Sequence, residues 1–346
     1  MVDQAYDDSG RCNDKGCEMI SKQKMVTSII LNYNKSEETI KLYRQLAAQT
    51  CPSHEILVVD NCSDIDQQEK LLAFLPENKI IKSKINGGFS YGMNLGISSC
   101  LRENQCDYVW ILNNDLKIPG DDVLEEVVSY LEEHPDIAMA TPLLYEPDSD
   151  EVSFSGGYID NNGWMHSAYD YAQFKEMEKT HPNRIWLDGT ALVIKRELIE
   201  HIGLLDETYF MYWEDIDFSY RVNLSGYTAK VVANVGVYHC SPQWSERPIY
   251  WHYYNARNEL LFMRNRCHAS WKTIMWAVER RLNDNLDQLL RHGFYDRADA
   301  VYRGIWDGLI GKTGKAEDFS APPRIVKMLG RLLSWYGARQ RVRRQG

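Results

Sequence analysis

Residues Val26–Leu31 read VTSIIL, and the polar segment Asn32-Tyr33-Asn34 follows them directly. A continuous apolar run that ends at turn-forming residues predicts a short strand buried on both faces. Ser36 is a suitable N-cap for the next segment, and two glutamates occupy the first turn after it. The folded part of the chain is therefore predicted to begin with a strand and a helix over residues 36–48.

The same alternation continues through the first third of the chain. Further strands are expected at Ile56–Val59, Lys79–Lys82 and Tyr108–Leu112, with helices over 67–74 and 90–101 between them. Apolar strands that alternate with helices predict an α/β fold with a parallel sheet covered on both faces. Ligands of such sheets bind at the carboxyl ends of the strands.

Four successive strand ends carry polar residues. They read Asn32-Tyr33-Asn34, Asp60-Asn61-Cys62-Ser63-Asp64, Asn86-Gly87-Gly88 and Asn113-Asn114-Asp115. Any one of these segments is an ordinary turn composition. Four in succession at one sheet edge favour a ligand site, so Asn61, Asn113 and Asn114 are candidate nucleotide-binding residues.

The second half of the chain has a more mixed pattern. A strand over Trp186–Ile194 is interrupted at Asp188-Gly189-Thr190, and another strand is expected over Val231–Tyr238. Helices are expected over 196–202, 214–224, 249–266 and 271–290.

Asp115 directly follows the apolar strand and projects from the sheet edge. A carboxylate in this position suits a divalent cation, because Mg²⁺ commonly takes one or two protein carboxylates together with phosphate oxygens. The competing interpretation is a helix N-cap ahead of residues 116–120. His239 stands at the end of another predicted strand, so a role as a further metal ligand is a hypothesis, although a lone histidine is more often structural.

Residues 213–217 read WEDID and place three carboxylates at the start of a predicted helix. Acidic residues also stabilise a helix N-terminus, so capping is the alternative interpretation. The functional interpretation makes Asp215 a general base that deprotonates an attacking hydroxyl. The candidates for binding the acceptor or the donor sugar are Trp213, Glu214, Asp217 and Arg221, and Arg221 is spaced to pair with Asp217.

These motifs together resemble glycosyltransferase family two. The stretches SIILNYN, EILVVDNCSD, NGGFSYGMNLGI, VWILNND, LDGTALVIKR and MYWEDIDFSYR occur in the order that the family shows, over about residues 25–265. Their style is similar to the rhamnosyltransferase branch. The resemblance implies the GT-A fold, a nucleotide-sugar donor, Mg²⁺ or Mn²⁺, and inversion at the anomeric carbon.

The resemblance also implies roles for individual residues. The nucleotide-binding segments match Leu31, Asn32, Tyr33, Asp60, Gly88 and Asn94. The segment beside the donor sugar and acceptor matches Gly189 and Thr190, the catalytic base matches Asp215, and the metal site matches Asp115 and His239. One departure is that Asn113 stands where the family's metal motif has its first aspartate, which removes one charge from the metal site.

Charge and composition limit the partners. The net charge of −10 argues against a general nucleic-acid binder. The cysteines form no CxxC pair, which is typical of reduced thiols in a cytosolic protein. The polar residues 1–24 are expected to be a disordered leader without a signal peptide, and no apolar run is long enough for a membrane span.

The predicted organisation has three parts. A catalytic domain covers residues 25–265, divided into a nucleotide-binding half (25–118) and an acceptor half (119–265), and a helical region covers 266–346. Residues 324–346 combine apolar side chains at helical spacing with arginines, which predicts an amphipathic helix on an anionic membrane surface. Packing on the protein or a contact between copies in a homo-oligomer is the alternative. The expected location is the inner face of the plasma membrane.

The expected function is transfer of a sugar, with L-rhamnose from dTDP-rhamnose as the favoured donor, to a glycan or lipid-linked glycan acceptor in bacterial surface polysaccharide synthesis. One alternative keeps the fold and uses a UDP-sugar carrying hexose, galactofuranose or N-acetylhexosamine. An alternative of another class is a non-catalytic nucleotide-binding scaffold protein. A Rossmann dehydrogenase is disfavoured, because the first strand is followed by NYNKSEE and not by GxGxxG.

Overall fold

The computed structural model describes residues 24–102, 106–147, 149, 151–154, 156–239, 242, 246–320 and 322. The predicted leader, except for Lys24, and the predicted basic helix over 324–346 therefore lie outside the described residues. Within the described ranges, no helix is both long enough and apolar enough to span a membrane.

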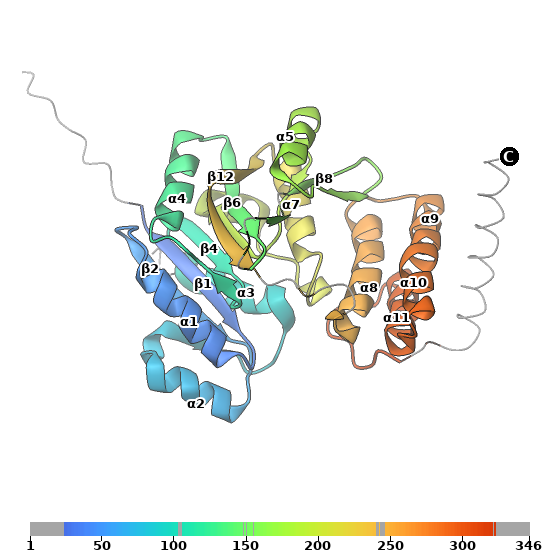
Figure 1. The fold of residues 1–346 in the computed structure, drawn as a ribbon, viewed down its shortest axis with the longest axis horizontal. Coiled ribbons are helices and arrows are strands. Elements are labelled where there is room, and N and C mark those ends of the chain that lie inside the picture. The colour runs from blue at the N-terminus through green and yellow to red at the C-terminus, as the bar shows by residue number, and fades with distance from the viewer. Residues whose placement is uncertain are drawn as a thin grey trace, which may run out of the picture.

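A mixed sheet forms the centre of the described structure (Figure 1). Eight of its strands follow the order β3-β2-β1-β4-β11-β6-β12-β5, and β7 pairs with β6. These strands are β1 Val26–Asn32, β2 His54–Asp60, β3 Ile80–Lys82, β4 Tyr108–Leu112, β5 Leu116–Lys117, β6 Ile137–Tyr145, β7 Val152–Phe154, β11 Ala191–Lys195 and β12 Thr228–His239. The first four are parallel to one another, as predicted, whereas β11 runs antiparallel to both of its neighbours.

Helices cover both faces of this sheet, because successive side chains of a strand point to opposite faces. Ile30 packs with the helices of one face and Ile29 with those of the other, and both are fully buried. The first face carries α1 Ser36–Ala47, α2 Ile65–Phe74 and α4 Val123–Glu133. The second carries α3 Gly88–Arg102, α5 Tyr171–Thr180, α6 Arg196–Ile202 and α7 Glu214–Leu224.

A small antiparallel sheet is inserted in the second half of the chain. It consists of β8 Gly157–Ile159, β9 Met165–Ser167 and β10 Ile185–Trp186 in the order β10-β8-β9. The strand predicted over 186–194 is divided between β10 and β11, with the polar interruption between them. Residues 116–117 form β5 and not the start of a helix, because Leu116 pairs with His239 at the sheet edge.

The remaining helices stand beside the sheet as a separate layer, on the right of Figure 1. They are α8 Ile249–Asn265, α9 Trp271–Arg281, α10 Asp287–Arg291 and α11 Tyr295–Ile310. The helix predicted over 271–290 is interrupted by a π-helical segment, Leu282–Leu286. A Cβ atom at Gly304 would lie 2.4 Å from the carbonyl oxygen of Tyr253, so α11 approaches α8 very closely.

Candidate functional site

A cleft of about 370 Å³ opens where the sheet, the start of α7 and the start of α8 meet. It contains seven of the residues that the sequence singles out: Asn113, Gly189, Thr190, Trp213, Glu214, Asp215 and His239. The rest of its wall is formed largely by aromatic and polar side chains: Phe89, Met165, Trp186, Asp188, Met211, Tyr212, Ile216, Arg247, Trp251 and Asn255. A cleft with aromatic walls and a few convergent charged groups suits a sugar-containing ligand.

Asp115 and His239 lie together at one side of this cleft. Antiparallel pairing of β5 with β12 brings the His239 Nε2 atom to 3.5 Å from the Asp115 Oδ1 atom. Burial raises the pKa of Asp115, but the hydrogen bond and charge of His239 together outweigh it, so the pKa lies below its ordinary value. Burial lowers the pKa of His239, but Asp115 outweighs this effect and the net shift is upward.

The two side chains of this pair are of types that bind divalent cations. A carboxylate and an imidazole suit Mn²⁺, and a carboxylate completed by phosphate and water oxygens suits Mg²⁺. Within the part of the chain that the structure describes, no group of three histidine, cysteine or acidic residues is arranged to hold a metal. The pair therefore fits a cation that a substrate's phosphates help to bind, and does not form a closed protein site.

Asp215 is held in a fixed orientation at the first turn of α7. Its Oδ2 atom accepts a hydrogen bond from the Gly189 amide at 3.1 Å, and its Oδ1 atom accepts one from the Ile216 amide at 2.8 Å. Burial and the nearby charge of Asp188 raise the pKa of Asp215 to about 7, against the lowering effect of these amides. A carboxylate with this pKa is suited to accept a proton near neutral pH.

Two further carboxyl groups lie beside Asp215. Glu214 is 6% exposed, and burial followed by the charge of Asp215 raises its pKa well above the ordinary value. Its Oε2 atom has no hydrogen-bond partner among the described residues. Asp188 accepts hydrogen bonds from the backbone amide and the hydroxyl of Thr190. Its charge acts on both Asp215 and His239, so Asp188 lies between the two parts of the site.

The loop that precedes Glu214 has a strained backbone. Phe210, Tyr212 and Trp213 have φ angles of 67°, 64° and 78°, a region that residues with side chains rarely adopt. Asn258 of α8 donates hydrogen bonds to three carbonyls of this loop, those of Tyr209, Met211 and Tyr212, at 2.8–3.1 Å. The helical layer therefore fixes the conformation that places Asp215.

Arg257 reinforces the same loop from the interior of the protein. Its guanidinium is fully buried and donates to the carbonyls of Tyr209 at 2.7 Å and Gly314 at 2.6 Å. The rings of Tyr253 and Tyr254 lie 5.4 and 4.8 Å from it. These contacts connect the chain after α11 to the loop before α7.

Gly88 joins the same loop to the first half of the sheet. Its φ is 91°, and a Cβ atom there would lie 2.0 Å from the carbonyl oxygen of Phe210. That oxygen also accepts a hydrogen bond from the Phe89 amide at 2.7 Å. Glycine is therefore required at position 88 because the Phe210 carbonyl packs directly against it. A contact between Gly88 and a nucleotide stays a prediction.

Gly88→Ala is expected to lower the free energy of unfolding by more than about 1 kcal/mol. An unfavourable backbone region alone costs about 1–3 kcal/mol, and the new Cβ also collides with Phe210. Thermal unfolding measures this effect. Gly203→Ala is the matched control, since Gly203 has a φ of 82° and open space around its Cβ position. Equal losses of stability in the two variants would show that the contact with Phe210 contributes nothing.

The predicted nucleotide-binding residues of β1 and β2 form a hydrogen-bond network at the sheet edge. Asn32 is fully buried and donates to Asp60 at 2.9 Å and to Ser63 at 3.0 Å. Asn61 donates to the carbonyl oxygen of Gly88 at 3.0 Å. Asn114 donates to Thr39 at 3.2 Å, and Thr39 donates in turn to Asn32. These residues hold the strand ends together, whereas Tyr33 is exposed.

Among the predicted site residues outside the cleft lining, Asn94, Asp217 and Arg221 support the fold. Asn94 donates to the Leu205 carbonyl and to Glu207, both at 2.9 Å, and so ties α3 to the loop after α6. Asp217 is fully buried and pairs with Arg221, as predicted, at 2.9 Å and also with Arg266. The side-chain contacts of Asn94, Asp217 and Arg221 explain these residues without a ligand.

Several residues of the cleft could not be predicted from the sequence pattern. Asp188 was recognised only as part of the interruption before β11, although carboxylate character at a strand end was an available signal. Trp251 and Asn255 come from the first two turns of α8 and Arg247 directly precedes this helix. Only the folding of the helical layer onto the sheet brings them to the site. Arg247 lies over the Trp251 ring, 5.1 Å from its centre.

Comparison with known proteins finds sugar transferases among the relatives of this chain. The "low-salt glycan biosynthesis hexosyltransferase Agl10" of Haloferax volcanii is 27% identical over 309 residues, covering 84% of this chain and 92% of that protein. The "N-acetylglucosaminyl-diphospho-decaprenol L-rhamnosyltransferase" of Mycobacterium tuberculosis is 21% identical over 279 residues, covering 73% and 89%.

Solved structures share the fold at lower identity. A mannosyltransferase of Pyrobaculum calidifontis, in complex with GDP-Man and Mn²⁺, has a TM-score of 0.53 at 14% identity, covering 84% of this chain and 89% of that chain. TarS residues 1–349 of S. aureus has a TM-score of 0.51 at 15% identity, covering 90% and 88%. The architecture is the GT-A fold. Residues 27–203, just over half of this chain, match a model of the family "Glycosyl transferase family 2", and the chain therefore belongs to glycosyl transferase family 2.

Proposed function

We propose that this chain is an inverting, metal-dependent glycosyltransferase that moves a sugar from a nucleoside diphosphate to a hydroxyl of a glycan or lipid-linked glycan. The observation that carries this proposal is that an oriented carboxylate, Asp215, lines the same cleft as His239, which has Asp115 3.5 Å from it. L-rhamnose from dTDP-rhamnose is the favoured donor. The similarity to the mycobacterial L-rhamnosyltransferase supports L-rhamnose as the sugar, and the similarity to the haloarchaeal hexosyltransferase supports a hexose as the alternative.

The chain's own groups divide the work. Asp215 accepts the proton of the acceptor hydroxyl as that oxygen attacks the anomeric carbon, and its two amide contacts keep the carboxylate oriented throughout. Glu214 lies beside this base, and burial together with the charge of Asp215 raises its pKa well above the ordinary value. Asp115 and His239 hold the donor side of the cleft. A divalent cation bound there supplies Lewis acidity that stabilises the leaving diphosphate.

Aromatic side chains and Arg247 are assigned to substrate binding in this proposal. Trp186, Trp213 and Trp251 provide apolar faces for sugar rings. Arg247 is close enough to His239 for its charge to lower the histidine's pKa, so it is placed to pair with the donor's diphosphate.

Arg247→Gln is expected to raise the donor KM about tenfold or more, the effect of removing one charge-assisted hydrogen bond. Steady-state kinetics at saturating acceptor measures it. Arg291→Gln removes an exposed arginine on α10 whose partner, Asp287, is on the same helix, and should leave the KM unchanged. A donor KM that stays the same in both variants contradicts the diphosphate role.

The rate of transfer is expected to depend on pH through Asp215. Since the base must be ionised and its pKa is about 7, kcat/KM for the acceptor should fall tenfold per pH unit below that value and level off above it. Donor binding, measured by calorimetry over the same pH range, separates this effect from loss of the donor. A flat profile between pH 5.5 and 8.5 would exclude Asp215 as the base.

The whole proposal is tested by calorimetric titration with dTDP-rhamnose, UDP-glucose, UDP-galactose and UDP-N-acetylglucosamine, each with Mn²⁺ and with chelator. Metal-dependent binding of dTDP-rhamnose alone is the expected result. Binding of a UDP-sugar instead keeps the mechanism and replaces the donor. If none of the four binds, these four donors are wrong, which favours another donor first and a non-catalytic role second.

A further inference from the structure

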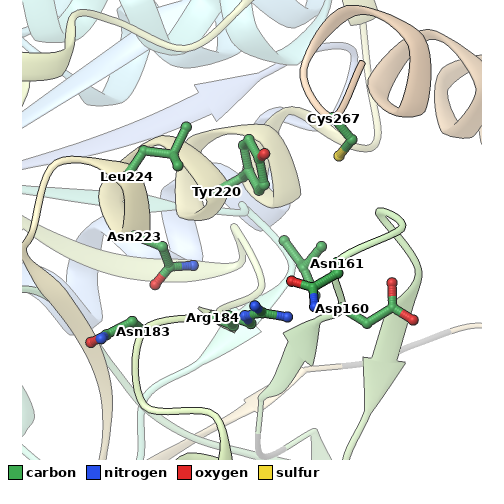
Figure 2. A pocket seen from close by; sticks show the side chains of 9 residues that line it. Asp160, Asn161, Asn183, Arg184, Tyr220, Asn223, Leu224 and Cys267 are labelled. Atoms are coloured by element: carbon green, nitrogen blue, oxygen red, sulfur yellow. The ribbon is translucent and has the colours of Figure 1, made fainter. Parts of the chain in front are cut away.

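A second cavity, of about 190 Å³, lies beyond the cleft between α7 and the β8–β9 hairpin (Figure 2). Tyr220, Asn223 and Leu224 project toward it from α7, and Asp160 and Asn161 come from the turn of the hairpin. The Arg184 side chain points into the space between these two elements.

The cavity and the cleft lie along the same face of the same elements. On α7, Ile216 lines the cleft, and Tyr220 and Leu224 line the cavity at intervals of four residues, which place them on one helix face. On the strand side, Trp186 lines the cleft and Arg184, two residues earlier, lines the cavity, in keeping with the period of a strand.

The hairpin shows the same continuity. Ile159 of β8 lines the cavity and Met165 of β9 lines the cleft, and these two residues are directly paired in the ladder. From Asp215 to Tyr220 is five residues of helix, a distance of about 7–8 Å along the axis. A ligand longer than one sugar can therefore extend from the base into the cavity.

Among the polar groups that line the cavity, the Arg184 guanidinium is the one that can bind an anionic ligand. Arg184 has no ion-pair partner within the described ranges. The Asp160 carboxylate is already engaged, because its Oδ1 atom accepts from the amides of Asn162 and Trp164 and its Oδ2 atom lies 3.5 Å from His166. Asn223 donates to the Ile185 carbonyl at 2.9 Å, while its Oδ1 atom is buried without a described hydrogen-bond partner.

We propose that this cavity is a subsite for a carboxylate-bearing sugar of the acceptor glycan, with Arg184 as the residue that binds the acid and Asn223 accepting a sugar hydroxyl. The inference rests on the proposed glycosyltransferase function and adds the substrate class. The volume suits one sugar ring, because it lies below the roughly 300–1,000 Å³ of pockets for larger ligands such as nucleotides. Arginine matches a carboxylate in a two-pronged geometry, which explains its use here.

The test uses saturation-transfer NMR with methyl β-D-glucuronide as the probe and methyl β-D-glucoside as its neutral match. Wild-type protein should give saturable signals from the glucuronide, with an affinity about tenfold higher than for the glucoside. Arg184→Gln should remove this preference, Arg184→Lys should restore part of it, and Arg291→Gln should keep it. Circular dichroism of each variant confirms that the fold is intact.

Two further samples show whether the glucuronide binds in this cavity or in the donor part of the cleft. Addition of UDP and Mn²⁺ should leave the glucuronide bound, and Asp215→Asn should bind it like the wild type. Displacement by UDP, equal binding of the two glycosides, or no binding at all would each overturn the subsite. Donor binding by the same samples tests the proposed function separately, so the two ideas can fail independently.

Discussion

Asp215→Asn is expected to lower kcat for sugar transfer by about 10²–10⁴-fold, the usual contribution of a general base, with donor affinity nearly unchanged. The amide keeps the size of the side chain and the oxygen that accepts from a backbone amide, but cannot accept the hydroxyl proton. Single-turnover transfer and donor calorimetry on the same sample separate chemistry from binding. Normal transfer by this variant would assign the base to another group, and Asp188, which also lines the cleft, would be the next candidate.

The same substitution should stabilise the protein at alkaline pH. The pKa of Asp215 is about 7 in the folded protein against an ordinary value of 3.8, so the folded state binds more protons between these values. Stability of the wild type therefore falls as pH rises from about 4 to 7. Melting temperatures of the variant and wild type should be similar near pH 4, with the variant higher at pH 8.

Asp217→Asn is the control for this sign. Asp217 lies two residues further along α7, is fully buried, and accepts hydrogen bonds from Tyr209, Arg221 and Arg266. Its replacement removes the carboxylate of Arg221 and one of the two carboxylates that pair with Arg266, so the melting temperature should fall at pH 8. A gain of stability in both variants would contradict the difference between Asp215, whose ionised form is destabilised by burial, and Asp217, which is paired with arginines.

Asp115→Asn is expected to weaken metal-dependent donor binding about 100-fold or more, since even residues that only support metal ligands contribute 10–100-fold. The variant should bind the donor with Mn²⁺ as weakly as the wild type does with chelator. Calorimetry with UDP or dTDP in both conditions measures this difference. Asp121→Asn, an exposed carboxylate on the following loop, should retain full metal dependence. A variant at Asp115 that still responds to Mn²⁺ would remove this pair from the metal site.

The first half of the fold was predictable because its information is local. Apolar runs such as Val26–Leu31 predict buried strands wherever they occur, and parallel strands must bring their polar ends to one edge. That reasoning predicted Asp115 at the sheet edge, where it lies 3.5 Å from His239 of the cleft wall, and the role of both residues stays a prediction. The short strands β8 and β9 have too few residues to show a period, so they could not be predicted.

Other residues depend on contacts between distant segments. Arg247 and Trp251 reach the cleft only because α8 packs beside the loop before α7, which no local pattern reports. Asn94 and Asp217 have the residue types expected of a site, but their hydrogen bonds hold loops and helices together. The residue type alone therefore does not tell whether a polar side chain beside a motif binds a ligand or stabilises the fold; its hydrogen-bond partners decide this.

The loop Tyr209–Trp213 also limits how this enzyme can be recombined with its relatives. Asn258 and Arg257 hold the loop from α8, and Gly88 meets it from the opposite side, while the family match ends at residue 203. A chimera that exchanges only the family-matched segment would separate the glycine from the carbonyl that it fits. A chimera that exchanges the loop together with α8, and keeps a glycine at position 88, preserves all the contacts that hold this loop in place. Acceptor preference is therefore best transferred between relatives with this larger segment.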